Sequence, residues 1–196
     1  IKKRNIPVIL TREPGGTNLG ENLREILNDN QQQHTNLTDL SQLYLFLAAR
    51  AQLVTERISP ILSEPNNVVV CDRYIDSTVA YQGYGVGFDI DFIKQANHYV
   101  IGDSKPNLTI LIDCPINIAL SRTMSRTEKT SRFETKPNEY HERVRKGFIK
   151  LANDNHDRWR IIDGTLDEKT LSNLNPGAAV IELYINSTSL GILAIF

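Results

Sequence analysis

The sequence has little that would direct it to a membrane, to nucleic acid or to an oxidising compartment. Its last apolar region, residues 178–196, is interrupted by polar residues at 186–189, so neither piece is long enough to span a bilayer. The net charge of −1 leaves no basic excess for nucleic acid or an anionic membrane surface. There are two cysteines, Cys71 and Cys114, each at the end of an apolar run, which favours buried thiols in a reducing compartment. We therefore expect neither a membrane nor a nucleic-acid partner.

Patterns typical of metal binding and of covalent catalysis are also scarce. The four histidines, His34, His98, His141 and His156, show no metal-ligand spacing. No Ser/His/Asp arrangement, Cys/His pair or carboxylate dyad has comparable support. We assign no histidine a chemical role, and the arginines and a few carboxylates remain as candidates.

Short β-branched runs alternate with amphipathic stretches along the chain, which is typical of the α/β class. Alternation of this kind predicts a parallel sheet covered by helices on both faces. A chain of 196 residues with 40% hydrophobic residues is most simply one domain. Strands are expected at 7–11, 68–71, 108–113 and 159–163, and helices at 18–27, 37–62, 90–101, 115–124 and 137–155.

The strand at 68–71 ends abruptly in Asp72 and Arg73. In open α/β sheets ligands bind outside the carboxyl ends of the strands, so these two residues stand where chemistry is usually done. The first strand ends in a similar way, in the loop 12–17, whose paired Gly15 and Gly16 allow a sharp turn and a close approach to a ligand.

Phe46 and Arg50 are one helical turn apart and project together from the long helix at 37–62. An aromatic ring and a guanidinium at this spacing can stack on a planar base and bond its edge. A place in the core is the alternative for Phe46. Arg24 lies off the apolar stripe of its helix, so it either reaches into a site or is a solvated surface residue.

Hydroxyl, phenol and amide groups gather just after Arg73, at Ser77, Tyr81 and Gln82. Glycines at 83, 85 and 87 predict a mobile loop there, and their alternation with larger residues is not a dinucleotide-binding fingerprint. Arginines near the carboxyl edge of a parallel sheet, with an aspartate among them, suit a phosphorylated ligand. Phosphoryl transfer needs mainly positioning and charge neutralisation, which such residues supply.

Four segments together resemble thymidylate kinase of the bacterial type: residues 11–17 (TREPGGT), 45–50 (LFLAAR), 71–74 (CDRY) and 80–83 (AYQG). The agreement runs from about residue 7 to residue 165, and the order and spacing of the segments make it specific. The resemblance implies a three-layer P-loop kinase fold of the nucleoside monophosphate kinase type. It also implies a cytoplasmic homodimer that transfers the γ-phosphoryl group of ATP, with Mg²⁺, to dTMP, giving dTDP for dTTP biosynthesis.

On the base side, the resemblance implies that Phe46 stacks on thymine and that Arg50 bonds the edge of the base. Ser77 and Gln82 would also contact the base. Tyr81 would crowd the 2′ position of the sugar and favour deoxyribose.

On the phosphate side, the resemblance implies that Arg73 holds the dTMP phosphate with Arg24 as its neighbour. Asp72 and Glu13 would orient the phosphates and the water shell of Mg²⁺, so that Asp72 acts on the metal indirectly, through water.

Arg122, Arg126 and Arg132 fall in or beside a polar stretch at 123–136 that is either a solvated loop or a lid that clamps phosphates. The resemblance favours the lid, with Arg122 and Arg126 as catalytic residues that also bind ATP. The family has an aspartate before Arg132, and Ser131 replaces it here.

The sequence contains no G-x-x-x-x-G-K-[ST] loop, which in the family follows the first, central strand and cradles ATP. We expect this to reflect truncation, with a kinase-like domain at 1–174 that lacks its first strand and an atypical tail at 175–196. A less favoured hypothesis is that residues 191–196 fill the vacant central position. The alternatives to a kinase are a non-catalytic protein that retains the dTMP pocket, and an inactive truncated product.

Overall fold

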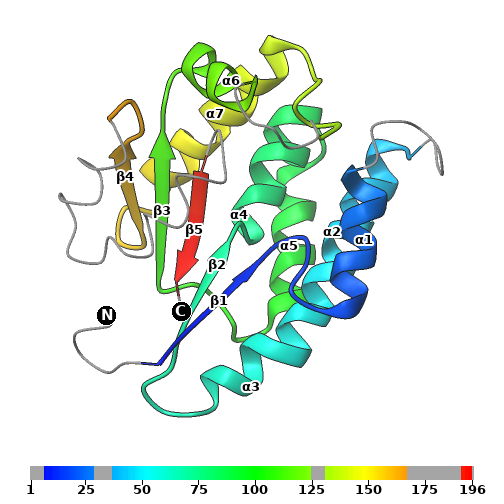
Figure 1. The fold of residues 1–196 in the computed structure, drawn as a ribbon, viewed down its shortest axis with the longest axis vertical. Helices are drawn as coiled ribbons and strands as arrows, with labels where there is room; N and C mark the ends of the chain where they lie inside the picture. Colours follow the sequence, from blue (N-terminus) through cyan, green and yellow to red (C-terminus); the bar gives the residue numbers. More distant parts are fainter. Residues whose placement is uncertain (1–6, 29–36, 125–130, 167–190, 196) are drawn as a thin grey trace.

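The computed structural model describes residues 7–28, 37–124, 131–166 and 191–195 (Figure 1). Within these ranges, one sheet has the strand order β1-β2-β5-β3-β4. Its strands are β1 (Val8–Arg12), β2 (Val68–Asp72), β3 (Leu108–Asp113), β4 (Trp159–Asp163) and β5 (Gly191–Ile195). The helices are α1 (Asn18–Asn28), α2 (Asp39–Leu53), η2 (Val54–Ile58), α3 (Ser59–Leu62), α4 (Ile75–Thr78), η3 (Val79–Val86), α5 (Ile90–Ile101), α6 (Ile116–Met124) and α7 (Asn138–Asp154), where η denotes a wider π-helical turn.

The α/β class and the predicted elements are confirmed, with ends within two residues of those expected. The sheet is mixed, however, and not wholly parallel. β1 pairs with β2 and β3 with β4 in parallel, whereas β5 runs antiparallel to β2 and β3. The strand–helix alternation that predicts parallel pairing ends at β4, so it says nothing about the direction of a strand from the tail.

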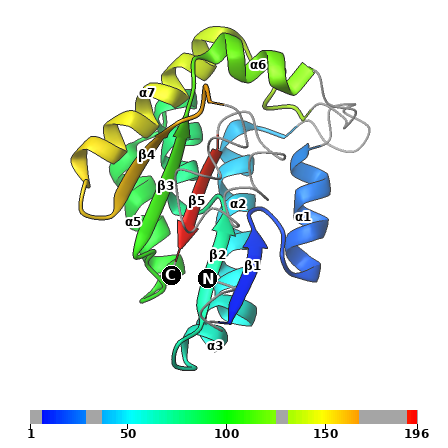
Figure 2. The same cartoon turned by 60° about the vertical axis from the view of Figure 1, so that its left-hand side comes forward.

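β5 occupies the central position of the sheet, between β2 and β3 (Figure 2). This confirms, for residues 191–195, the less favoured hypothesis that the end of the tail fills that place. The remainder of the predicted tail, residues 175–190 and 196, lies outside the described residues. In the part of the chain that the structure describes, β5 alone joins the β1–β2 pair to the β3–β4 pair.

Helices α1, α2, α5 and α7 gather on one face of the sheet (Figure 2). Strand residues alternate between the two faces: Val69 and Cys71 pack with helical residues, whereas Val70 joins Ile110 and Ile112 in a separate cluster. Val70 is 2% exposed, so the second face of the sheet is covered at this position, whereas Leu10, its partner on β1, is 50% exposed. Among the described residues, no helix is long and apolar enough to cross a membrane.

The glycine-containing segment after Gln82 is helical, which corrects the predicted mobile loop. It forms η3, and its glycines permit close contact with α7. A Cβ at Gly85 would lie 2.7 Å from the ring of Tyr140, and a Cβ at Gly147 would lie 2.6 Å from the ring of Tyr84. The glycines therefore serve packing, and only Gly87, with a φ of 102°, ends the helix in a left-handed conformation.

β1, β2, β3 and β4 all point in the same direction, so their carboxyl ends share one edge of the sheet. Arg12, Asp72, Asp113 and Asp163 are the last residues of these four strands. The carboxyl edge therefore collects charged residues, as the sequence predicts for Asp72 and Arg73.

Candidate functional site

The loop after β1 is held against the first turn of α1. Oε1 of Glu21 accepts a hydrogen bond of 2.8 Å from the backbone N–H of Gly16, and Oε2 pairs with Nη2 of Arg12 at 2.9 Å. Because the Gly16 amide and then the Arg12 guanidinium stabilise the carboxylate, the pKa of Glu21 lies below its ordinary value. The loop that is expected to approach a ligand thus has a defined shape.

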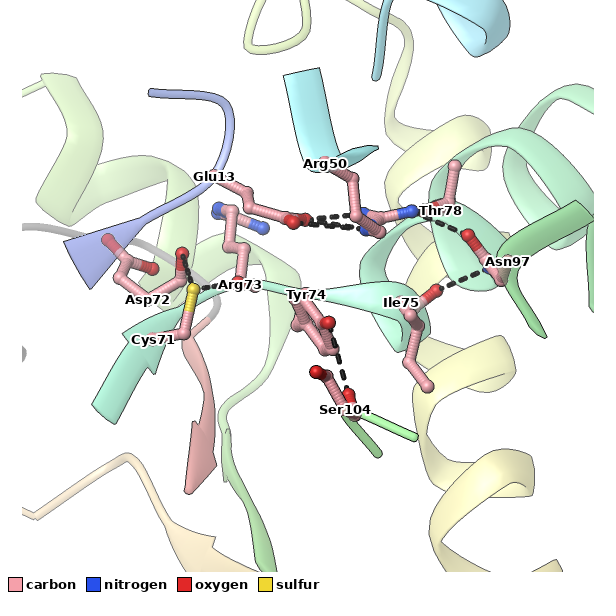
Figure 3. Close-up of polar contacts among 10 residues, drawn as sticks. All are labelled: Glu13, Arg50, Cys71, Asp72, Arg73, Tyr74, Ile75, Thr78, Asn97 and Ser104. Carbon is pink, nitrogen blue, oxygen red and sulfur yellow. Dashed lines mark hydrogen bonds and ion pairs between the residues drawn. The ribbon is translucent and has the colours of Figure 1, made fainter. Parts of the chain in front are cut away.

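Glu13, in this loop, forms a buried ion pair with Arg50 of α2 (Figure 3). Both are almost fully enclosed, Glu13 at 4% and Arg50 at 1% exposure. Nε of Arg50 lies 3.0 and 2.9 Å from the two carboxylate oxygens, and Nη2 lies 2.5 Å from Oε2. Burial raises the pKa of Glu13, and the Arg50 guanidinium opposes that rise.

The other end of the Arg50 guanidinium is also bound. Nη1 donates to Oγ1 of Thr78 at 2.7 Å and to Oδ1 of Asn97 at 2.5 Å. Of the five guanidinium hydrogens, these contacts use one on Nε, two on Nη1 and one on Nη2. Contact between Arg50 and a base edge, as predicted, would therefore be made through Nη2.

Asp72 and Arg73 stand at the carboxyl end of β2, beside the Glu13 loop (Figure 3). The backbone N–H of Glu13 donates to the carbonyl of Asp72 at 2.8 Å, which joins the two strand ends. Arg73 has a φ of 63°, a left-handed conformation that turns the chain sharply away from the strand. Its Nη1 lies 3.2 Å from the hydroxyl of Tyr81.

Arg24 approaches the same edge from α1, where its Nη1 donates to the carbonyl of Pro14 at 3.0 Å. Burial is the main cause that lowers the pKa of Arg24, and the positive charges of Arg12 and Arg73 add to it. The carboxylates of Glu21 and Asp72 act in the opposite direction. Arg24 is half-buried and bonded to the loop after β1, which favours a place beside the site over the solvated surface position of the alternative.

Three aromatic rings, those of Phe46, Phe133 and Tyr81, contact one another near Arg73. Phe46 packs against Phe133 with ring centroids 5.8 Å apart, and Phe133 meets Tyr81 edge-on at 6.4 Å. Phe46 is half-buried in α2, so it is not a fully enclosed core residue. Sequence reasoning missed Phe133, although an aromatic residue in an otherwise polar stretch was the signal for it.

Ser77 and Gln82 lie on the same segment as Tyr81, in α4 and η3. The Oγ of Ser77 is buried and has no hydrogen-bond partner among the described residues. A buried hydroxyl without a partner costs free energy, which a bound polar ligand can recover. Gln82 is 2% exposed and follows Tyr81 in η3.

Arg122 lies near the carboxyl edge, where its Nη1 donates to the carbonyl of Gly164 at 2.6 Å, just after β4. Arg126 lies outside the described residues, as does the rest of the middle of the predicted lid, residues 125–130. Arg132 is half-buried in the described part that follows.

The donor set for Mg²⁺ is sparse. Within the described ranges, no group of three or more His, Cys, Asp or Glu side chains could hold a metal ion. Mg²⁺ usually keeps several waters and binds one or two carboxylates together with substrate phosphates. Asp72, at the end of β2, fits the predicted indirect contact through water.

Comparisons with known proteins agree on one family. The family model described as Thymidylate kinase matches residues 1–174. The thymidylate kinase of Geotalea daltonii is 41% identical over 170 residues, which span 84% of this chain and 78% of that protein. That of Carboxydothermus hydrogenoformans is 44% identical over 164 residues, with 84% and 77% covered.

The crystal structure of thymidylate kinase from Ehrlichia chaffeensis has a similar fold, with a TM-score of 0.64 and 36% sequence identity. The similarity covers 86% of this chain and 80% of that one. It confirms the predicted P-loop kinase type of fold. On the sequence match, the relatives and the shared fold together, the chain belongs to the thymidylate kinase family of nucleoside monophosphate kinases.

Proposed function

We propose that this chain forms the dTMP-binding part of a thymidylate kinase, which in its complete form transfers a phosphoryl group from ATP to dTMP and yields dTDP. The observation that carries the proposal is the juxtaposition at the end of β2. There, Arg73 contacts both the hydroxyl and the ring of Tyr81, Arg24 bonds the loop after β1, and α4 begins two residues after Arg73 and carries the buried, unpartnered hydroxyl of Ser77.

The dTMP phosphate lies against Arg73 and Arg24. Arginine suits this task, because its guanidinium can bond two phosphate oxygens at once. Asp72 and Glu13 adjoin these arginines and orient the phosphates, Asp72 through the water shell of Mg²⁺. Bound Mg²⁺ would supply charge neutralisation between the two nucleotides.

The thymine ring stacks on Phe46, and polar groups of Ser77, Gln82 and Arg50 bond its edge. Phe133 forms a further wall, because its ring already contacts Phe46 and Tyr81. The Tyr81 hydroxyl, held by Arg73, limits the space at the 2′ position of the sugar.

Arg122 and Arg126 neutralise the charge of the transferring group and contact ATP. The sequence includes no G-x-x-x-x-G-K-[ST] loop for the ATP phosphates, so we derive no step through bound ATP. We also propose, from the family, a homodimer that works in the cytoplasm.

A second candidate is a protein that binds dTMP without phosphorylating it. It is favoured by two observations: the sequence holds no phosphate loop, and the antiparallel β5 takes the central position of the sheet. An inactive truncated product is the third candidate.

A coupled assay of ADP release with ATP, Mg²⁺ and dTMP separates these functions. We expect turnover from a chain extended by a strand and a phosphate loop, and none with UMP or AMP at comparable concentration. If the extended chain binds dTMP but releases no ADP, the binding protein is the better assignment.

A further inference from the structure

Asn97 lies in the middle of α5, outside every motif that the sequence singles out, yet it is only 3% exposed. Its side chain bridges two elements that carry proposed base contacts (Figure 3). Oδ1 accepts from Nη1 of Arg50 at 2.5 Å, and Nδ2 donates to the carbonyl of Ile75 at 3.1 Å. Ile75 is the first residue of α4.

The chemistry of the partners fixes the orientation of this amide. An arginine side chain only donates and a carbonyl oxygen only accepts, so the amide oxygen faces Arg50 and the amide nitrogen faces Ile75. The opposite orientation would place donor against donor and acceptor against acceptor in a buried position, which is costly. Asn97 therefore holds α2 and the start of α4 at a fixed separation.

We propose that Asn97 is a positioning residue for the base end of the acceptor-nucleotide site. It acts through Arg50 and through α4, which carries Ser77 and Thr78. Its two bonds lead to neither Arg73 nor Arg24, so we expect the arginine contacts with the phosphate to be retained without it. This inference rests on the proposed function, since it requires the base to lie beside Arg50 and α4.

Two variants and one control test the inference. Asn97→Leu removes both hydrogen bonds at similar volume. Asn97→Asp keeps an oxygen toward Arg50 but turns an acceptor toward the Ile75 carbonyl. Gln95→Leu is the matched control, because it removes an amide from an exposed position of the same helix. NMR titration gives the dissociation constants of dTMP and of 2-deoxyribose 5-phosphate, which lacks the base.

We expect Asn97→Leu to weaken dTMP binding about tenfold, in line with the loss of buried hydrogen bonds, and to leave 2-deoxyribose 5-phosphate binding unchanged. The dissociation constant of dTMP for Asn97→Asp should lie between those of Asn97→Leu and the original chain. The constant for Gln95→Leu should equal that of the original chain. An equal loss for both ligands, or no loss in a folded variant, overturns the inference.

If Asn97→Leu does not fold, Asn97→Asp provides the test: its loss of dTMP affinity is compared with its loss of 2-deoxyribose 5-phosphate affinity. If neither variant folds, the amide serves the fold and the inference is wrong. Should the original chain bind neither ligand, the proposed function fails and the inference fails with it. If the original chain binds dTMP and folded Asn97→Leu binds it equally well, only the inference fails.

Discussion

Around the predicted dTMP site, arginines occupy different environments that suit different roles. Arg50 is enclosed and bound by Glu13, Thr78 and Asn97, so its charge mainly fixes the positions of neighbouring elements. Arg73 leaves the end of β2 in a left-handed conformation and contacts Tyr81 at the carboxyl edge. We propose that its charge binds the ligand.

Replacing Arg73 by alanine should weaken dTMP binding by about 10- to 100-fold, the range expected for loss of a charge-assisted bond to phosphate. Calorimetric titration measures the change. Arg160→Ala, which removes an exposed arginine from β4, is the control and should bind dTMP as the original chain does. Equal binding by Arg73→Ala would remove this residue from the phosphate site.

Glu21 should make a pH-dependent contribution to stability. Because its pKa is lowered in the folded chain, that contribution is present above the pKa of the unfolded chain, about 4.3, and is lost as pH falls through the lower folded value. Glu21→Gln should therefore reduce the free energy of unfolding at pH 7, by less than about 1 kcal/mol because the pair is exposed.

Urea unfolding at pH 7 and pH 3 tests the role of Glu21, with Glu25→Gln on the exposed face of the same helix as control. The difference between the original chain and Glu21→Gln should shrink at pH 3. A difference that is the same at both values would contradict the role of the Gly16 and Arg12 contacts.

Sequence reasoning located Asp72 and Arg73 correctly at a strand end, because an abrupt change from apolar to charged residues marks that place. It could not find the partners of Arg50. Glu13 and Asn97 are 37 and 47 residues away along the chain, and only the folded arrangement brings them together. Phe133 stands out in the sequence as an aromatic residue in a polar stretch, but its contacts with α2 and η3 are likewise visible only in the fold.

Among the helices and strands, β5 determines whether the sheet is continuous. Ala194 is 1% exposed and pairs with Cys71 of β2 and Thr109 of β3. A large charged side chain there has no room and no partner, so it would be expelled together with the strand.

Ala194→Arg should therefore abolish the single cooperative unfolding transition or lower its midpoint strongly, as followed by circular dichroism on heating. Ile161→Arg is the control, because Ile161 lies in β4 and is 49% exposed. It should unfold like the original chain. An unchanged transition for Ala194→Arg would show that β5 does not hold the two strand pairs together.

The contact of η3 with α7 depends on Gly147. A methyl group there would overlap the Tyr84 ring, so Gly147→Ala should destabilise the fold by about 1–3 kcal/mol despite the better helix propensity of alanine. Lys146→Ala, at the exposed neighbouring position, should change the free energy of unfolding little. Chemical unfolding measures both, and a stabilised Gly147→Ala variant would contradict the close packing.

Hydrophobic periodicity predicts most helices and strands well, because an element that buries one face has apolar residues at regular spacing in the sequence. It fails for η3, where the glycines predict a loop and the structure has a helix. Glycines that admit a neighbouring ring and glycines that permit a turn look alike in a sequence. Only the positions of Tyr84 and Tyr140 distinguish the two cases.

For the molecule as a whole, family membership and the fold agree, and the centre of the sheet is the unusual feature. The similarity to thymidylate kinases extends over residues 1–174, whereas β5 comes from beyond that range. Nothing in the strand–helix alternation could predict its direction, because the alternation ends before the tail and supplies no crossover helix to impose one.

The proposed function depends above all on dTMP binding at the carboxyl edge of this sheet. Isothermal titration calorimetry of the chain with dTMP, and with AMP as comparison, measures that binding. We predict saturable binding of one dTMP per chain, at least about tenfold tighter than AMP because the base is read by stacking and by polar contacts to its edge. A folded chain that binds no dTMP, or that binds AMP equally well, would contradict the proposed site.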